Sequence, residues 1–378
     1  MAYCEDRKIL VLQGGGALGA YQAGAYEELV EAGHLPSWVA GISIGAVNAA
    51  IIAGNAPKQC VTRLRQFWEL VSSRLIAWPL GYDDSSRRFF NEASAALVAA
   101  GGVPGFFEPR IPPAVFMPQG TPEAISIYDT SPLRGTLLEL VDFDLLNSGP
   151  VRLSIGAVQV RTGNMKYFDT TSHKIGPEHI MASGALPPGF PPIEIDGEPY
   201  WDGGLVSNAP LQHVLERCGP REDSVIFQID LFSAHGPVPK TLFEIAQREK
   251  EIRYSSRTRL STDVFRELQA IRRAVHHLRP LLPDDVRESG DWQLLDNVGC
   301  DAAITIVQLI HRRAAYWTQS NDYEFSRYTV DEHWQAGRDD VERTLLHPAW
   351  KNRTRPEDGV TILDLTRDVA PSAEGHEP

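Results

Sequence analysis

Blocks of apolar and polar positions change period several times along the first part of the chain. Residues 8–13 form a short apolar run typical of a buried strand, and the Ala-rich residues 17–32 predict a helix. A second short strand is expected at 38–42. The helix expected at 44–53 is apolar almost all round and should therefore be buried. With a further amphipathic helix at about 59–75, this order predicts a parallel sheet with covered faces.

The segment 81–125 breaks this alternation. Prolines are interleaved there with Phe and Met side chains, so we expect a long irregular insertion, too aromatic to be a solvated linker. The alternation then resumes. The expected elements are a helix at 132–146, strands at 151–160 and 165–168, a short helix at 178–183, and strands at 199–201 and 225–231.

The pattern changes again near residues 235–240. Residues 241–279 predict long helices, because apolar side chains recur there at steps of four and three. Residues 303–310 fit either a strand or a helix, and a final helix is expected at 331–346. The expected organisation is an α/β domain at 1–235, a mostly helical C-terminal region packed on it at 236–369, and a disordered tail at 370–378.

Composition narrows the function classes. The chain has 378 residues, 43% of them apolar, and a net charge of −13, which excludes wholesale disorder and disfavours a nucleic-acid partner. Cys4, Cys60, Cys218 and Cys300 lie far apart without metal-ligand spacing. We therefore expect neither a metal site nor a disulfide framework, and we identify no cofactor. A reducing, cytoplasmic location fits this cysteine usage.

No membrane-directing segment is predicted. The first ten residues carry charges of both signs and lack a basic region followed by an apolar one, so a secretory signal is not expected. Residues 35–57 are uncharged and long enough to span a bilayer. They contain prolines, asparagines and three glycines, however, and predict a buried strand, turn and helix instead.

The first candidate for chemistry is the glycine-rich turn Gly14-Gly15-Gly16-Ala17-Leu18-Gly19, between a predicted strand and a predicted helix. Its backbone N–H groups can converge on an anion at a helix N-terminus, either a phosphate or the oxyanion of acyl transfer. Taken alone, the turn favours nucleotide binding. The acid that would hold a ribose is missing at the end of the second strand, and no P-loop lysine follows.

The second candidate is Gly41-Ile42-Ser43-Ile44-Gly45, which is G-x-S-x-G between a strand and a helix. In that context Ser43 is expected to stand exposed at a helix N-terminus as a nucleophile. The plainer alternative is that Ser43 caps the helix. The glycine-rich turn one strand earlier favours the nucleophile, because a nucleophile needs an oxyanion hole nearby.

A serine nucleophile also needs a base. Asp202 lies in Trp201-Asp202-Gly203-Gly204 after a short strand, and the plainer interpretation of this Asp-Gly-Gly is a simple turn. A Ser–His–Asp order is also available, with His213 or His235 as the base, although neither lies in a distinctive motif. At this point an esterase with a histidine base and a non-catalytic nucleotide- or lipid-binding protein both remain open.

Together these motifs resemble one family. GGGALGAYQAG, GISIG and DGG, in this order, are similar to the motifs of the patatin-like phospholipases, which are lipid acyl hydrolases. Residues 182–192 look like the family's loop before the aspartate, and the resemblance covers roughly residues 7–212. It implies a patatin-like three-layer α/β fold, hydrolysis of lipid esters and no cofactor.

Residue by residue, the resemblance implies Ser43 as nucleophile and Asp202 as its partner in a dyad. It implies the amides of Gly14, Gly15 and Gly16 as the oxyanion hole. The motif glycines that would support this machinery are Gly19, Gly41, Gly45, Gly203 and Gly204. Two positions depart from the family pattern: Gln13 stands where Asp is frequent, and Leu18 where Arg or Lys is frequent. Both leave the backbone donors in place.

Two segments bear on substrate choice. The aromatic part of the insertion, 103–117, either lines an acyl channel, forms a mobile cover, or is an ordinary packed excursion. Residues 240–279 carry ten Lys or Arg and five Asp or Glu, so this stretch either docks peripherally on an anionic membrane or packs on the core with a solvated face. The expected partner is a lipid or other acyl ester. Substrate identity and oligomeric state do not follow from the sequence.

Overall fold

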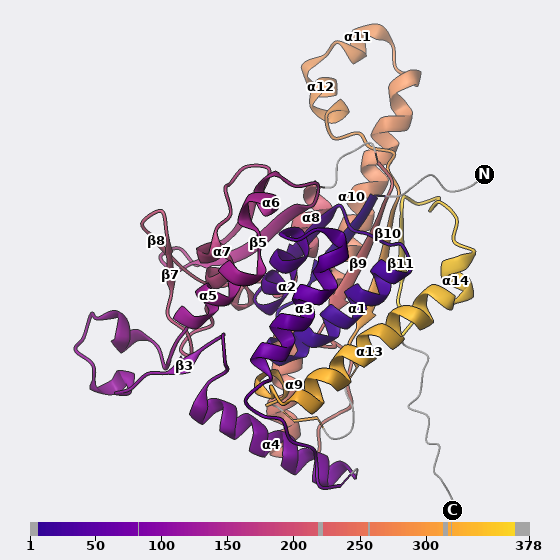
Figure 1. Ribbon diagram of the computed structural model, residues 1–378. Coiled ribbons are helices and arrows are strands. Elements are labelled where there is room, and N and C mark those ends of the chain that lie inside the picture. The colour runs from indigo at the N-terminus through magenta and orange to yellow at the C-terminus, as the bar shows by residue number, and fades with distance from the viewer. Residues whose placement is uncertain are drawn as a thin grey trace, which may run out of the picture.

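The computed structural model describes residues 7–81, 83–217, 222–255, 258–312, 317–318 and 320–366. The predicted tail at 370–378, together with Cys4 and Cys218, lies outside the described residues. A central sheet with helices on both faces organises the described chain (Figure 1). The predicted fold class, a mainly parallel α/β sheet flanked by helices, is confirmed.

The described chain forms a sheet of nine strands in the order β11-β10-β9-β1-β2-β5-β8-β7, with β6 also paired to β5. The neighbours from β11 to β5 run parallel, whereas β6, β7 and β8 add antiparallel pairs at one side. The strands are β1 (Arg7–Leu12), β2 (Trp38–Gly41), β5 (Arg152–Gln159), β6 (Met165–Asp169), β7 (Ile193–Ile195), β8 (Glu198–Asp202), β9 (Ser224–Asp230), β10 (Ile304–Ile310) and β11 (Val360–Leu363). A separate pair joins β3 (Glu108–Pro109) to β4 (Tyr128–Asp129).

Helices cover both faces of this sheet. The longer ones are α1 (Gly19–Glu31), α2 (Ile44–Ala53), α3 (Pro57–Val71), α4 (Asp84–Gly101), α5 (Ser131–Leu140), α9 (Leu242–Tyr254), α10 (Thr258–Leu278) and α13 (Arg327–Leu346). The shorter ones are α6 (Phe143–Ser148), α7 (Pro177–Ser183), α8 (Leu211–Arg217), α11 (Asp284–Arg287), α12 (Gly290–Asp296) and α14 (Pro348–Lys351).

Alternating side chains of β1 divide between the two faces, as the pleat of a strand requires. Leu10 and Leu12 join the cluster that contains side chains of α1, α2 and α13. Ile9 and Val11 belong to the cluster that includes α8 and Phe265 of α10. Because every residue of β1 from Ile9 onward is buried, a continuous apolar run was the correct signal for this strand.

The prediction of an irregular insertion at 81–125 is wrong for its first half. Residues Asp84–Gly101 form the helix α4, and Asp83 caps it by accepting hydrogen bonds from the N–H groups of Ser85 and Ser86. The buried face of α4 includes Arg87, Asn91 and Ser94 beside Ala95 and Val98. The spacing of apolar residues did not predict this helix, because several of its buried positions carry polar side chains.

Two further expectations need correction or completion. The single helix predicted at 132–146 is two helices, because Val141 is extended and Asp142 caps α6 by accepting from the N–H groups of Asp144 and Leu145. The ambiguous segment 303–310 is a strand, β10. The C-terminal region therefore contributes two parallel strands to the sheet, in addition to its predicted helices.

The helix α13 lies against α1, and both helices cover the same face of the sheet (Figure 1). Two glycines allow this close approach. A Cβ added to Gly24 would collide with the Trp334 backbone, and one added to Gly337 would lie 2.8 Å from the Ala25 nitrogen. The Tyr21 hydroxyl also donates to Asp340 at 2.6 Å. Backbone contact and a buried hydrogen bond thus join α1, near the start of the described chain, to α13, near its end.

Candidate active site

Ser43 stands at a strained turn between β2 and α2. Its φ of 55° and ψ of −125° are unusual for a residue with a side chain. The turn is tight because a Cβ on Gly45 would lie 2.5 Å from the Leu12 carbonyl oxygen, while one on Gly41 would meet the Gly45 carbonyl. The Ser43 side chain makes no capping hydrogen bond to α2. The alternative that Ser43 serves as a helix cap is therefore wrong.

A second serine holds this turn in place. The Ser43 N–H donates to Ser183 Oγ at 2.9 Å, and Ser183 Oγ donates to the Gly156 carbonyl oxygen at 2.7 Å. Ser183 is fully buried at the end of α7, and Gly156 belongs to β5. The turn that carries Ser43 is thus tied to the neighbouring strand of the sheet through one hydroxyl.

Asp202 ends β8 and lies beside Ser43. Its carboxylate accepts the Gly204 N–H at 2.7 Å from the short helix η4 (Gly203–Leu205). Burial raises the pKa of Asp202 to about 6, although hydrogen bonds from Ser43 and the Gly204 amide oppose that shift. The structure therefore brings Ser43 and Asp202 together, from positions 159 residues apart in the sequence, with the carboxylate removed from water.

The three glycine amides of the turn after β1 differ in their hydrogen bonding. The Gly14 N–H donates to the Asn208 carbonyl oxygen at 3.1 Å, so this amide is occupied by the fold. Within the described residues, the N–H groups of Gly15 and Gly16 meet no protein acceptor. Gly16 has a φ of 56°, and a Cβ added there would collide with the Asp322 carbonyl oxygen. The expectation that all three amides are open to an anion is therefore corrected to Gly15 and Gly16.

The unexpected Gln13 has a clear structural role. It is fully buried, and its side-chain oxygen accepts the N–H groups of Leu231 and Phe232 at 2.5 and 2.9 Å. Its side-chain nitrogen donates to the Tyr254 carbonyl at 3.0 Å, which also accepts from Asn208 at 2.8 Å. A neutral amide both donates and accepts, so Gln13 joins the glycine-rich turn to the loop after β9 and to α9.

Ser43, Asp202 and the glycine-rich turn all line one cavity of about 360 Å³. Most of the remaining lining is apolar or aromatic. It includes Ile44, Val98, Phe106, Phe107, Ile127, Tyr128, Leu186, Pro187, Pro188, Phe190, Phe232, Tyr254, Tyr323 and Phe325. Of the aromatic part of the insertion, 103–117, only Phe106 and Phe107 line the cavity.

Neither candidate histidine base lies at this cavity. His213 is buried in α8 and stacks on Tyr167, with ring centroids 3.9 Å apart. His235 lines a different cavity. No histidine is among the described residues that line the cavity with Ser43, so the arrangement does not support a Ser–His–Asp esterase.

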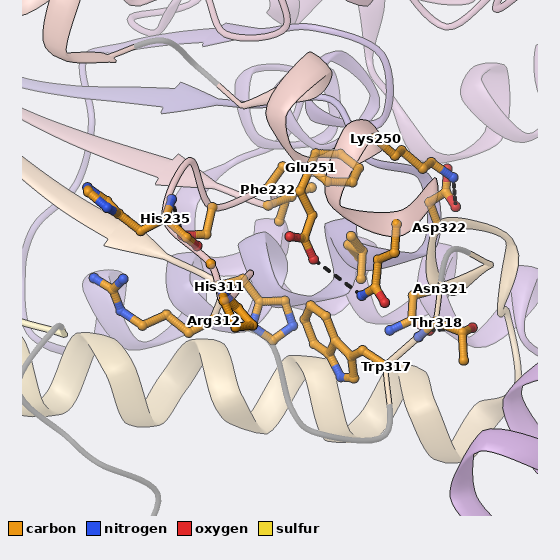
Figure 2. A pocket seen from close by; sticks show the side chains of 16 residues that line it. Phe232, His235, Lys250, Glu251, His311, Arg312, Trp317, Thr318, Asn321 and Asp322 are labelled. Atoms are coloured by element: carbon orange, nitrogen blue, oxygen red, sulfur yellow. Dashed lines mark hydrogen bonds and ion pairs between the residues drawn. The ribbon is translucent and has the colours of Figure 1, made fainter. Parts of the chain in front are cut away.

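A second cavity, of about 220 Å³, lies beyond the glycine-rich turn and is shown in Figure 2. Glu251 and Trp317 face it, and Leu18, Phe232 and Asp322 also line it. Several of its charged groups are paired. Lys250 lies 2.5 Å from Asp322, and Arg312 lies 2.6 Å from Asp364. Phe232 and Asp322 line both cavities and so form part of the wall between them.

The C-terminal residues of the site had no usable signal in the sequence. Tyr254, Tyr323 and Phe325 reach the cavity from α9 and from the segment before α13, far along the chain from Ser43. No short motif surrounds any of them. Asn208, six residues after Asp202, was also missed, although it contacts the glycine-rich turn through both its backbone and its side chain.

The described residues contain neither a metal-binding cluster nor a membrane-spanning helix. No group of three or more His, Cys, Asp or Glu side chains there is arranged to hold a metal ion. Among the described helices, none combines the length and the apolar character needed to cross a bilayer.

Comparison with known proteins places the chain in a family. A family model described as patatin-like phospholipase matches residues 10–215, and a second, described as patatin phospholipase, matches residues 252–357. The crystal structure of VipD from Legionella pneumophila is similar over 87% of this chain and 67% of its own, with 15% sequence identity and a TM-score of 0.35. A search of curated proteins found no match.

Proposed function

Since the chain belongs to the patatin-like phospholipase family, we propose that it hydrolyses carboxylic esters of lipids with Ser43 as nucleophile and Asp202 as base. One observation carries this proposal. Ser43 lines an apolar cavity beside the buried Asp202 carboxylate, whose pKa the Ser43 hydroxyl lowers, and it does so on a turn where it does not cap its helix. A nucleophile within reach of a base, beside unpaired amides, is the arrangement that acyl transfer needs.

In the first half of the reaction, Asp202 accepts the proton of Ser43 Oγ as that oxygen attacks the ester carbonyl carbon. A free aspartate has a pKa of about 3.9 and is a weak base for a serine. Burial raises the pKa of Asp202 to about 6, which makes it a stronger base while leaving it ionised at neutral pH. The carbonyl oxygen becomes an oxyanion, for which the amides of Gly15 and Gly16 are the proposed donors.

The tetrahedral intermediate then collapses, and its bond to the alcohol oxygen breaks. The proton held by Asp202 passes to the departing alkoxide, which leaves as an alcohol, and the acyl group stays on Ser43 Oγ. In the second half, Asp202 takes a proton from water and the hydroxide attacks the acyl carbon. Ser43 leaves, recovers the proton, and a fatty acid is released.

The lining of the cavity supports an apolar acyl group as the part of the substrate that enters it. Phe106, Phe107 and Phe190 form an aromatic cluster there, with ring centroids 5.1 to 6.0 Å apart. An apolar chain loses contact with water against such a wall, which favours lipid esters over small polar ones.

The experiment that tests the function compares Ser43→Ala and Asp202→Asn with wild type on short nitrophenyl esters and on phospholipid in mixed micelles. Each variant should lose roughly a thousandfold or more of kcat, because members of a catalytic unit fail together. Ser73→Ala and Asp144→Asn, which change exposed serine and aspartate side chains outside the cavity, serve as matched controls. Equal hydrolysis by wild type and both site variants would reject the proposal.

A further inference from the structure

A projecting loop at residues 110–127, here named the apolar loop, has no function in the mechanism above. It extends from the two-stranded pair β3–β4 and stands away from the sheet (Figure 1). Its two ends are close, since the Arg110 N–H donates to the Ile127 carbonyl at 3.2 Å. Two short 3-10 turns, Ala114–Phe116 and Pro122–Ile125, contact each other inside it. The loop is therefore a compact unit on a short stalk.

The side chains that this loop presents to water are mainly apolar. Ile111, Val115 and Phe116 are 92, 85 and 74% exposed, and Ile125 and Ile127 are about half exposed. The loop's charged residues are Arg110 and Glu123, so its net charge is zero. Isolated apolar side chains are common on protein surfaces, but five of them on one projecting loop of 18 residues indicate an interaction site.

The stalk of the apolar loop is part of the wall of the cavity that holds Ser43. Ile127 and Tyr128 line that cavity, together with Pro188 and Gly189. The Ile127 N–H donates to the Pro188 carbonyl at 3.1 Å, and the Tyr128 N–H to the Gly189 carbonyl at 2.9 Å. The exposed apolar surface is thus continuous with the apolar lining of the cavity.

We propose that the apolar loop inserts into the leaflet of a lipid bilayer that faces the protein and places the cavity beside its substrate. This inference rests on the proposed function, because a lipid ester leaves the bilayer most easily where an apolar path joins the bilayer to the cavity. Ile111, Val115 and Phe116 are the side chains that enter the hydrocarbon boundary. Binding through an apolar loop of zero net charge depends on buried apolar area and not on anionic lipids.

The basic stretch 240–279 is the alternative membrane contact, and several of its charges are already satisfied within the protein. Arg248 pairs with Glu251, Lys250 with Asp322 and Arg273 with Asp301, at distances of 3.1, 2.5 and 3.1 Å. A basic surface would bind anionic vesicles and release them in salt, whereas an apolar loop binds neutral vesicles in salt as well. These two properties separate the alternatives.

The test uses the full chain carrying Ser43→Ala, so that lipid is not consumed, and vesicles of phosphatidylcholine. Sedimentation with vesicles at 0.05 and 0.5 M salt gives the partition coefficient. Adding Val115→Asp and Phe116→Asp should lower that coefficient at least about tenfold, since charges resist entry into the hydrocarbon boundary. Leu294→Asp, which changes an equally exposed apolar residue on α12, should leave it unchanged.

Three results would overturn the inference: no binding to phosphatidylcholine vesicles, equal loss with Leu294→Asp, or binding only to anionic vesicles that salt abolishes. Catalytic assays on the enzyme with Ser43 restored keep this separate from the proposed function. The Val115→Asp, Phe116→Asp variant should hydrolyse soluble nitrophenyl esters at the wild-type rate and lose activity on vesicles. If no ester is hydrolysed by wild type, the proposed function fails, whereas the vesicle-binding result still decides whether the loop binds membranes.

Discussion

The N-terminal part of the chain, residues 7–215, and the C-terminal part, residues 222–366, contribute differently to the same site. The first provides Ser43, Asp202 and the glycine-rich turn, each at or just beyond the end of a strand. The second provides lining side chains such as Tyr254 and Phe325, and the strands β10 and β11 that extend the sheet. The proposed reactive groups come from one region, whereas the lining side chains and the strands of the sheet come from both.

This difference teaches where the effects of mutation should fall. A reactive group must be placed to within a fraction of an ångström, so a small shift in its turn reduces the rate without unfolding the protein. A supporting helix contributes through packed area, so its disruption lowers stability while leaving the rate of the folded enzyme nearly unchanged. Turnover and unfolding measured on the same variants can break or sharpen this contrast.

The largest effect on rate within this comparison is expected for Gly15→Ala. A Cβ on Gly15 would lie 2.7 Å from Leu231 Cδ1 and 3.0 Å from Leu231 Cβ, so either that side chain or the turn must shift, and a shift of the turn displaces its amide donors. Removing one oxyanion donor costs about 3–4 kcal/mol of transition-state stabilisation, so kcat on a soluble ester should fall by about 100- to 1000-fold.

Gly184→Ala is the matched control for this variant. Gly184 lines the same cavity, but a Cβ there meets nothing closer than 3.8 Å, so kcat should stay near the wild-type value. Thermal unfolding must show that both variants are folded. A folded Gly15→Ala enzyme with unchanged kcat would remove Gly15 from the proposed oxyanion hole.

A smaller effect, on stability, is expected for Gly337→Ala in α13. We propose that residues 236–369 form an integral support of the α/β domain at 1–235. Replacing an exposed glycine inside a helix by alanine stabilises it by about 1 kcal/mol. At Gly337 the added methyl would collide with the α1 backbone, so overpacking should instead lower the free energy of unfolding by about 1–3 kcal/mol.

Denaturant unfolding measures the change in the free energy of unfolding caused by Gly337→Ala, and the sign of that change tests whether α13 is a support. Gly290→Ala, at the start of α12 where a Cβ meets nothing within 4 Å, is the control that should not destabilise the protein. If Gly337→Ala is stabilising, α13 is loosely attached, and the C-terminal region is an appendage and not a support.

The smallest effect near neutral pH is the pH dependence of the rate. As the proposed base, Asp202 must be ionised, and burial raises its pKa to about 6. On soluble esters, kcat/KM should therefore rise with pH, level off above about pH 7, and fall roughly tenfold for each pH unit well below 6. A profile that remains flat down to pH 4 would show that the base titrates as an ordinary aspartate.

The same shift has a consequence for stability. Because the folded state holds this proton more tightly than the unfolded chain, the contribution of Asp202 to stability falls as pH rises from about 4 through 6. Asp202→Asn removes the ionisation, so its free energy of unfolding relative to wild type should increase across that interval. Chemical denaturation of both proteins at pH 4.5 and 7 checks the sign.

Much of the N-terminal half could be predicted from the sequence because its signals are local. The apolar runs of β1 and β2, the all-apolar α2 and the G-x-S-x-G turn each depend on neighbours a few residues away. The helix α4 was missed, since its buried face includes Arg87, Asn91 and Ser94. Their partners, such as Glu332 and Glu324, lie more than 200 residues further along the chain.

The sequence by itself determined the first strands and helices of the N-terminal part, the two turns that carry Ser43 and the unpaired glycine amides, and the family resemblance. Only the tertiary structure decided that the Gly14 amide is occupied, that Ser183 holds the Ser43 turn, and that Asp202 is dry enough for its pKa to reach about 6. Backbone conformation follows from short-range sterics and periodicity. Desolvation and hydrogen-bond partners depend on groups that only the folded chain brings together.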